Sequence, residues 1–227
     1  MRVRCLAYHR SHAGVRTTRT APDSPMSIRI KRHLQARYPH LADLLGQVKT
    51  VPVLKRRDLA LPEALVRVVT GQMLSSQAAQ TIYERVQDAA RARDLPGSWL
   101  LDQDSLRGCG LSGAKARTIC AIGAQVGANS QALDHWYTLP PQELLDEIRQ
   151  FRGMGPWTAS IIALFYVGHE DVFPAADGSI QRAIALIEGA SKGRRKRRVD
   201  PDQAVPYRSY LALYLWRALD TGLLKSS

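Results

Sequence analysis

The sequence predicts an all-α protein. Apolar residues recur at helical spacing over most of the chain after residue 26, and no segment shows the sustained two-residue alternation of a β-strand. The 227 residues, of which 45% are apolar, are enough to build one compact domain or two small lobes that share a cleft.

Four helices are expected before residue 100, and proline and glycine mark their limits. Pro62 suits the first turn of a helix because its missing N–H would be unpaired there anyway. Pro96 and Gly97 end this part of the chain. The expected helices cover about Ser27–Tyr38, Leu41–Val48, Pro62–Leu74 and Gln77–Arg91.

Five more helices are expected in the second half. Ser112 is a plausible N-cap for the first of them, which buries Ile119, Ile122 and Val126 at helical spacing. An extended stretch, Asp171–Ala176, separates the third from the fourth. The expected helices cover about Ser112–Val126, Pro140–Phe151, Pro156–Val167, Asp177–Glu188 and Asp202–Leu219.

The net charge of +12 is concentrated in two segments. Residues 1–25 have a net charge of +4 and residues 192–198 have six positive charges, which leaves +2 for the rest. We interpret residues 1–25 as a basic, disordered or artefactual extension; a transit peptide, a flexible basic arm and a true start at Met26 are alternatives. The run 192–198 is interpreted as a mobile basic loop that raises non-specific DNA affinity, or as a nuclear-localisation signal.

Several classes of protein are disfavoured by the sequence. Cys5, Cys109 and Cys120 form neither a metal-ligand spacing nor a disulfide framework. No apolar run is long enough to span a membrane, and no secretory signal is recognisable. We expect no cofactor, no catalytic metal, a monomer, and a cytoplasmic, nucleoid-associated protein in a bacterium or a nuclear one in a eukaryote.

The most informative segment is FRGMGPWTA, Phe151–Ala159. Two glycines two residues apart between amphipathic helices permit a tight turn whose backbone can approach another group. The N–H groups at the start of the following helix then point outward with the positive end of the helix dipole, which suits a phosphate. An ordinary helical hairpin is the alternative if the glycines are considered alone.

Together with DVFPAAD (Asp171–Asp177), this segment resembles the hairpin, Gly/Pro-rich loop and aspartate of the helix–hairpin–helix DNA glycosylase superfamily, often abbreviated HhH-GPD. The chain is most similar to 3-methyladenine DNA glycosylase II, the AlkA type, in a short form without the additional N-terminal β domain. Three further motifs agree in the family's order: GQMLSSQAA (Gly71–Ala79), GLSGAKA (Gly110–Ala116) and PYRSYLALYLW (Pro206–Trp216).

This resemblance implies two helical lobes with the active site in the cleft between them. One lobe would comprise about residues 62–165 and contain the hairpin. The other would combine the N-terminal helices with about residues 170–227, so that residues 26–227 form one glycosylase domain.

The resemblance also makes Asp177 the catalytic carboxylate. Cleavage of an N-glycosidic bond gives the sugar oxocarbenium character, which a nearby carboxylate can stabilise while it orients water. A purely structural N-cap is the alternative for Asp177. Trp157 stands where strand-cleaving members have a lysine, so base removal without strand cleavage is expected. No cysteine follows Cys120, so the C-terminal iron–sulfur cluster of the endonuclease III branch is excluded.

By resemblance, a loop with Gln72 and Met73 enters the duplex and Met73 is the candidate wedge; a buried core methionine is the equal alternative. Trp157 and Trp216 would line the base pocket, where an indole face can stack on a cationic purine, or else pack in the core. Arg208 and Tyr210 fall in a family motif and receive no chemistry beyond tying the last helix to the body. The residues expected to contact DNA phosphate are Gly153, Gly155, Thr158 and Lys115.

In the family, main-chain carbonyls of the hairpin also hold a monovalent cation, and Phe151 and Met154 would supply them here. The expected partner is damaged double-stranded DNA and the expected substrate an alkylated purine. A same-fold glycosylase for uracil, a mismatched thymine or an oxidised purine, and a non-catalytic DNA-binding module, are the alternatives. Pocket aromatics favour the first hypothesis, because neutral bases usually need specific polar partners for discrimination.

Overall fold

The computed structural model describes residues 24–189 and 198–224. Within these ranges the regular structure is entirely helical and no β-strand is present, so the all-α prediction is confirmed. Nearly all of the basic extension 1–25 and of the basic run 192–198 lies outside the described residues. No helix in the described ranges is long and apolar enough to cross a membrane.

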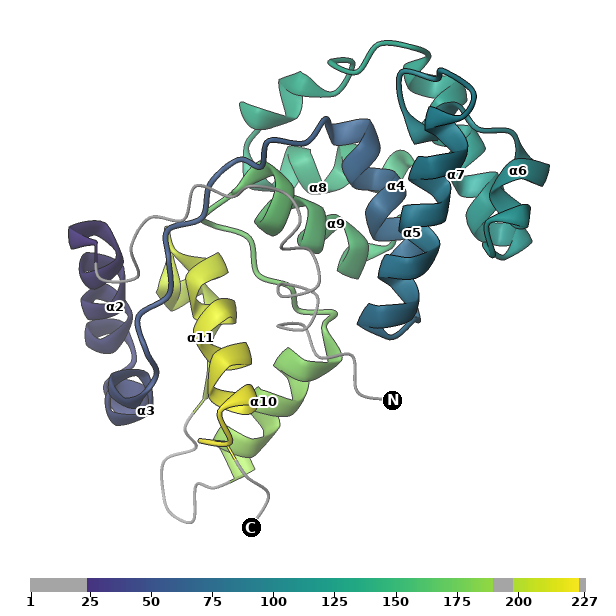
Figure 1. Ribbon diagram of the computed structural model, residues 1–227. Coiled ribbons are helices and arrows are strands. Elements are labelled where there is room, and N and C mark those ends of the chain that lie inside the picture. Colours follow the sequence, from purple (N-terminus) through teal and green to yellow (C-terminus); the bar gives the residue numbers. More distant parts are fainter. Residues whose placement is uncertain (1–23, 190–197, 225–227) are drawn as a thin grey trace.

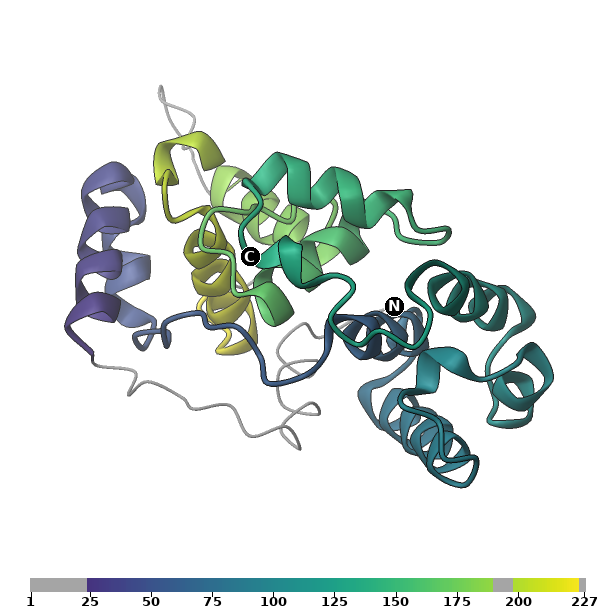
Figure 2. The ribbon, with the colours of Figure 1, turned by 90° about the horizontal axis from the view of Figure 1, so that it is seen from above.

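One group of helices forms around α4, which lies at its centre (Figures 1 and 2). Every residue of α4 from Leu61 to Thr70 is buried, because α5, α7 and α9 all pack against it. The members of this first lobe are α4 (Leu61–Gly71), α5 (Ser76–Arg91), α6 (Gln103–Gly108), α7 (Gly113–Val126), α8 (Pro141–Gln150) and α9 (Pro156–Ile162).

A buried carboxylate joins three parts of this lobe. Glu63 of α4 accepts hydrogen bonds from the Tyr83 hydroxyl (3.0 Å) and the Gln87 amide (2.6 Å) of α5. It also accepts from the N–H and hydroxyl of Ser98, at 3.0 and 2.7 Å. Buried polar groups are tolerated when they are fully hydrogen-bonded, so Glu63 has a structural role here.

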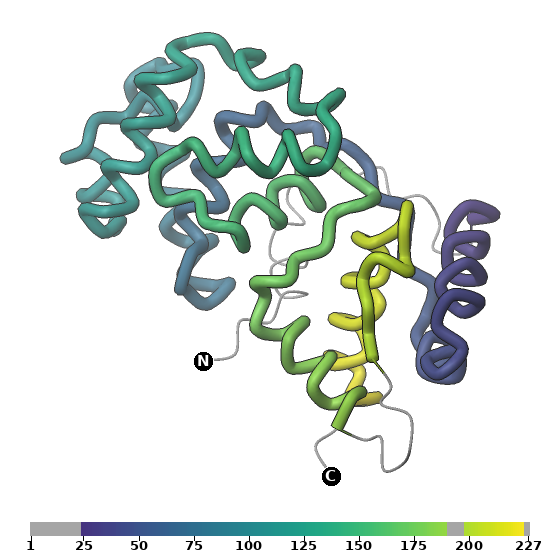
Figure 3. The backbone as a smooth tube through the Cα atoms, turned by 180° about the vertical axis from the view of Figure 1, so that it is seen from behind, coloured from purple at the N-terminus to yellow at the C-terminus, as the bar shows by residue number. Residues whose placement is uncertain are grey.

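The second group consists of α2 (Pro25–Arg37), α3 (Ala42–Gln47), α10 (Gly178–Gly189) and α11 (Arg208–Asp220). In Figure 3, α11 lies between α10 and the pair formed by α2 and α3. Residues Ser209–Trp216 of α11 are all buried, as expected for a helix that is covered on several sides.

Two chain segments, 48–60 and 168–177, connect the two groups, and they meet at one point. The Arg57 N–H donates to the Tyr166 carbonyl at 3.0 Å. A Cβ on Gly168 would lie 2.5 Å from the carbonyl carbon of Lys55, and the φ of Gly168 is +80°. Only glycine allows both this conformation and this close approach.

The observed helices differ from the predicted ones mainly at their ends. α2 begins at Pro25, capped by Ser24, so the expected boundary after residue 25 falls inside its first turn. The predicted helix Asp202–Leu219 is wrong: a 3₁₀ turn, Pro201–Ala204, precedes α11, and Pro206 follows a cis peptide bond between them. Proline cannot continue a helix from that position, because it lacks the N–H and clashes with the preceding turn. The short helix α6, capped by Asp102, was not predicted.

Candidate active site

Asp177 lies at the start of α10 and its side chain is buried, at 3% exposure. Its Oδ1 accepts hydrogen bonds from the backbone N–H groups of Ser179 (3.0 Å) and Ile180 (2.9 Å). This is N-cap geometry, and the helix dipole favours the ionised carboxylate at this position. Asp177 therefore is the N-cap of α10, as the structural alternative expected.

Two tryptophans from different lobes complete the surroundings of this carboxylate. The Trp157 indole N–H of α9 donates to Oδ2 at 2.8 Å, and the Trp216 indole N–H of α11 donates to Oδ1 at 2.9 Å. The predicted pocket residues and the predicted carboxylate are thus in direct contact, at the junction of the two lobes. A cap needs no indole donors, so this arrangement exceeds what helix capping alone explains.

The two indoles differ in their packing. Trp216 is 3% exposed and stacks on Phe165 of the π-helical segment Ala163–Val167, with 5.9 Å between ring centroids. Trp157 is half-buried in the first turn of α9. Trp216 is therefore packed in the core while its N–H reaches Asp177, and its place in a base pocket stays a prediction.

The segment that leads to Asp177 is fixed to the start of α11. The Arg208 guanidinium pairs with Asp171 through contacts of 2.9 and 3.0 Å, and this pairing raises the pKa of Arg208. The Tyr210 hydroxyl donates to Glu170 at 2.7 Å, and the buried Ser209 hydroxyl accepts from the Val172 N–H at 2.9 Å. The expectation that Arg208 and Tyr210 tie the last helix to the body is confirmed.

The hairpin between α8 and α9 is formed by two glycines with different functions. Gly153 has φ +81°, and a Cβ there would lie 2.7 Å from the Thr118 hydroxyl, so this position requires glycine for the fold itself. An added Cβ on Gly155 would meet open space. Gly155 is the N-cap of α9 and provides no side chain to its first N–H groups, which suits them to an external acceptor.

The hairpin carbonyls were expected to hold a monovalent cation. The Phe151 carbonyl accepts the Met154 N–H at 3.1 Å, and the Gly153 carbonyl accepts from the Gln72 amide at 3.2 Å. A carbonyl oxygen that accepts one hydrogen bond keeps a second lone pair, with which it can still be a ligand of such an ion. The cation site therefore stays a prediction. Among the described residues no cluster of three or more His, Cys, Asp or Glu side chains is placed to hold a metal ion.

Met73 follows the last turn of α4 in a conformation that methionine rarely adopts. Its φ is +59° and its side chain is 75% exposed. The alternative of a buried core methionine is therefore wrong. An exposed apolar side chain held in a strained backbone is a frequent property of functional positions.

Lys115 requires a correction. It was expected to meet a DNA phosphate, but its ammonium donates to the main-chain carbonyls of Thr70 (2.9 Å) and Gln72 (2.6 Å). The side chain is half-buried, and this burial lowers the pKa of Lys115. Lysine commonly satisfies the last carbonyls of a helix in this way, here those at the end of α4.

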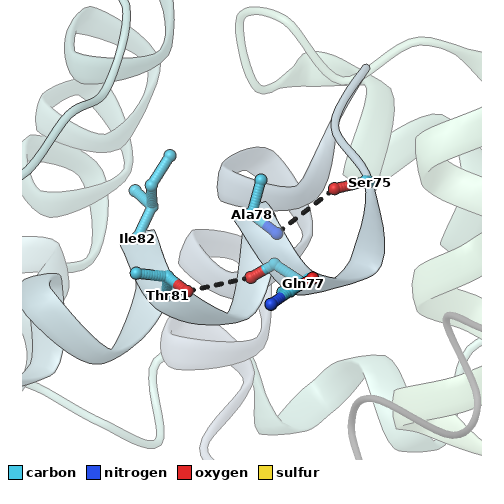
Figure 4. Close-up of a pocket in the computed structure, with 5 residues that line it drawn as sticks. All are labelled: Ser75, Gln77, Ala78, Thr81 and Ile82. Carbon is cyan, nitrogen blue, oxygen red and sulfur yellow. Dashed lines mark hydrogen bonds between the residues drawn. The ribbon is translucent and has the colours of Figure 1, made fainter.

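Two cavities elsewhere in the protein do not include Asp177. Figure 4 shows a shallow one on α5, lined by Ser75, Gln77, Ala78, Thr81 and Ile82. The other lies beside the hairpin, where Glu147 accepts from His135 and from the indole of Trp136.

Comparison with known proteins agrees with this geometry. No family model matches the sequence. The chain is 26% identical over 190 residues to DNA-3-methyladenine glycosylase 1 of Schizosaccharomyces pombe, covering 81% of this chain and 82% of the relative. It is 29% identical over 195 residues to a probable bifunctional transcriptional activator/DNA repair enzyme AlkA of Mycobacterium tuberculosis, covering 80% of this chain and 38% of that longer protein.

Solved structures extend the likeness to the fold. A DNA-3-methyladenine glycosidase from Bacillus halodurans superposes with a TM-score of 0.72 at 23% identity, over 91% of this chain and 94% of that one. The S. pombe 3-methyladenine DNA glycosylase in complex with abasic DNA superposes with a TM-score of 0.61 at 25% identity, over 85% of this chain and 97% of that one.

In sequence and in fold, the chain is similar to DNA glycosylases of the helix–hairpin–helix type. The relatives described above carry the names 3-methyladenine glycosylase and AlkA, in agreement with the resemblance that the motifs indicated. Two contributions to this site were not predicted from the sequence. One is the use of the indole N–H groups as donors to Asp177, and the other is the Thr118 side chain beneath Gly153. Both arise from contacts between distant segments, and no local pattern indicates them.

Proposed function

We propose that this protein is a monofunctional DNA glycosylase that hydrolyses the N-glycosidic bond of alkylated purines of the 3-methyladenine type. It leaves an abasic site as the first product of base excision repair. The observation that carries the proposal is the buried Asp177 carboxylate, held by one indole N–H from each lobe at 2.8 and 2.9 Å.

The reaction needs a negative charge beside the sugar carbon that loses the base. As the glycosidic bond breaks, positive charge develops on the sugar, and a fixed carboxylate stabilises it. Oδ1 of Asp177 takes three of the four donors named above, whereas Oδ2 takes only that of Trp157. Oδ2 therefore keeps acceptor capacity for the attacking water. Because the hydrogen bonds are formed in the free protein, the carboxylate is preorganised.

An alkylated purine suits this site because its leaving group already carries a positive charge. The Trp157 ring lies beside the carboxylate, and its electron-rich face can attract a cationic base. The base must first leave the duplex, and we assign the exposed Met73 to occupy the space it vacates. The main-chain N–H groups of Gly155 and Thr158, at the start of α9, provide the phosphate contacts that fix the position of the double-stranded DNA, to which the protein binds as a monomer.

Trp157 also limits the chemistry to base removal. An indole is not an amine nucleophile and cannot form the Schiff base that precedes strand cleavage. Borohydride should consequently trap no covalent adduct between this protein and damaged DNA. A trapped adduct would contradict the monofunctional assignment and leave the glycosylase assignment intact.

The substrate is tested by incubating the protein with methylated, uracil-containing and undamaged duplexes, followed by measurement of released bases and abasic sites. We expect release of 3-methyladenine by the wild type and not by Asp177→Asn. Release of uracil alone would show that the substrate is uracil and that the assignment of alkylated purines is wrong. DNA binding without any release would contradict the catalytic role and support a binding module.

A further inference from the structure

The loop with Gln72 and Met73 is held from two sides, and one of these involves a lysine that the proposed mechanism does not use. α4 ends at Gly71, and carbonyls in the last turn of a helix have no partner within the helix. The Lys115 ammonium donates to the carbonyls of Thr70 and Gln72, one on each side of this helix end. It thereby fixes the direction in which the chain leaves α4.

The other side of the loop is attached to the hairpin. The Gln72 amide donates to the Gly153 carbonyl (3.2 Å) and to the Thr158 hydroxyl (3.0 Å), which lie on opposite sides of the turn between α8 and α9. Gly153 in turn packs on Thr118. Lys115 and Thr118 are three residues apart on α7 and so share one face of that helix.

We propose that Lys115 is a positioning residue: with Thr118 it makes α7 a brace that fixes the Met73 loop at a set distance from the phosphate-binding hairpin. This inference rests on the proposed function. A side chain that enters a duplex must do so at a fixed offset from the phosphates that the protein grips. The brace sets that offset before DNA binds.

Two properties of the site distinguish this role from a direct phosphate contact. The Lys115 side chain is half-buried, whereas lysines that contact a DNA backbone extend from the surface. Two of the three hydrogens of its ammonium are already donated to carbonyls within the protein. In addition, Met73 has a φ of +59°, a conformation that persists only when its surroundings enforce it.

The test compares Lys115→Met with Arg107→Met, which removes one positive charge from an exposed position of α6 in the same lobe. Hydrogen–deuterium exchange of residues 70–76 in the free protein measures the loop, and circular dichroism verifies folding. Single-turnover excision at saturating protein measures positioning in the complex. Binding to undamaged duplex at several salt concentrations measures phosphate contacts.

We expect Lys115→Met to accelerate exchange in residues 70–76 at least tenfold. It should slow excision about ten- to a hundredfold, the usual effect of a misplacement near 1 Å. Its affinity for undamaged DNA and its salt dependence should match those of Arg107→Met. Unchanged exchange would overturn the proposal. So would normal excision at saturation with weaker binding and a salt slope reduced by about one, the signature of a lost phosphate contact.

If Lys115→Met does not fold, Thr158→Val carries the same test, because it removes a Gln72 acceptor and keeps the side-chain shape. Faster exchange of residues 70–76 in this variant supports the brace, and unchanged exchange refutes it. Exchange is measured without DNA, so it remains decisive even if the wild type releases no base. That result would overturn the proposed function alone.

Discussion

The starts of two helices of the candidate site, α9 and α10, are joined by the hydrogen bond from Trp157 to Asp177, but the two helices satisfy their first N–H groups in opposite ways. Asp177 precedes the first residue of α10, and its carboxylate caps that helix. Gly155 precedes the first residue of α9 and offers no side chain. The first N–H groups of α10 are therefore satisfied by the Asp177 carboxylate, whereas those of α9 are available to an anion from another molecule.

This difference separates two tasks that both need helix N-termini. A carboxylate that is already capped and held by two indoles can oppose positive charge on a sugar. An uncapped start with open space around Gly155 can receive a phosphate. Trp157 connects the two, because it lies in the first turn of α9 and donates to Asp177.

The largest expected effect on base excision comes from neutralising the Asp177 carboxylate at the start of α10. Asp177→Asn should lower the rate of base excision about a thousandfold, by analogy with the loss of a main electrostatic contact to a transition state. Asparagine is as good an N-cap as aspartate, so the protein should still fold. The asparagine N–H₂ group would face the indole N–H of Trp157, so two donors would oppose each other and one hydrogen bond would be lost. This loss should lower the free energy of unfolding by about 1–3 kcal/mol.

Single-turnover kinetics and thermal unfolding measure the two effects of Asp177→Asn separately. Binding to DNA should persist in the variant, because the hairpin is untouched. Normal excision by Asp177→Asn would reduce Asp177 to a cap and remove the contrast between the two helix starts.

The uncapped start of α9 is tested by a pair of glycine variants. Gly155→Ala should weaken DNA binding about tenfold, the value of one hydrogen bond to a charged group, and should leave stability unchanged. Gly153→Ala should instead lower the free energy of unfolding by about 1–3 kcal/mol, because of its positive φ and the contact with Thr118. Fluorescence anisotropy and chemical denaturation measure the pair. Equal behaviour of the two variants would contradict the assignment of separate functions.

The smallest expected effect on base excision comes from removing the hydrogen bond between Trp157 of α9 and Asp177. Trp157→Phe keeps an aromatic face for the base and removes only the N–H donor to Oδ2 of Asp177. We expect excision to slow roughly fivefold to tenfold, the usual net value of one hydrogen bond, with DNA affinity unchanged. Trp157→Ala is the matched comparison, since it also removes the ring face. If both variants excise normally, Trp157 has no part in the site.

Local signals in the sequence were sufficient for most of the fold. Caps, prolines and apolar spacing located α4, α5, α7 and the hairpin to within a few residues. The error at the C-terminus was avoidable, because Pro206 in the middle of a predicted helix is itself a signal for a break. The short α6 was missed although Asp102 is a good cap, because six residues are too few for a clear apolar period.

The candidate site could be predicted only as a set of residues. Asp177, Trp157 and Trp216 were all named, but they are 20 and 39 positions apart and their hydrogen bonds depend on how the lobes meet. Lys115 shows the limit most clearly. A lysine near the start of a helix resembles a phosphate ligand in the sequence. Only the tertiary structure reveals that its ammonium donates its hydrogen bonds to carbonyls at the end of another helix.

Met73 has a consequence for protein engineering. A methionine at φ +59° with a side chain 75% exposed is unfavourable for the folded protein on its own, by an amount on the order of 1–2 kcal/mol for the backbone alone. Glycine or asparagine would relieve that strain. A selection for thermal stability without DNA should therefore enrich Met73→Gly early, and the resulting thermostable protein would be a poor repair enzyme.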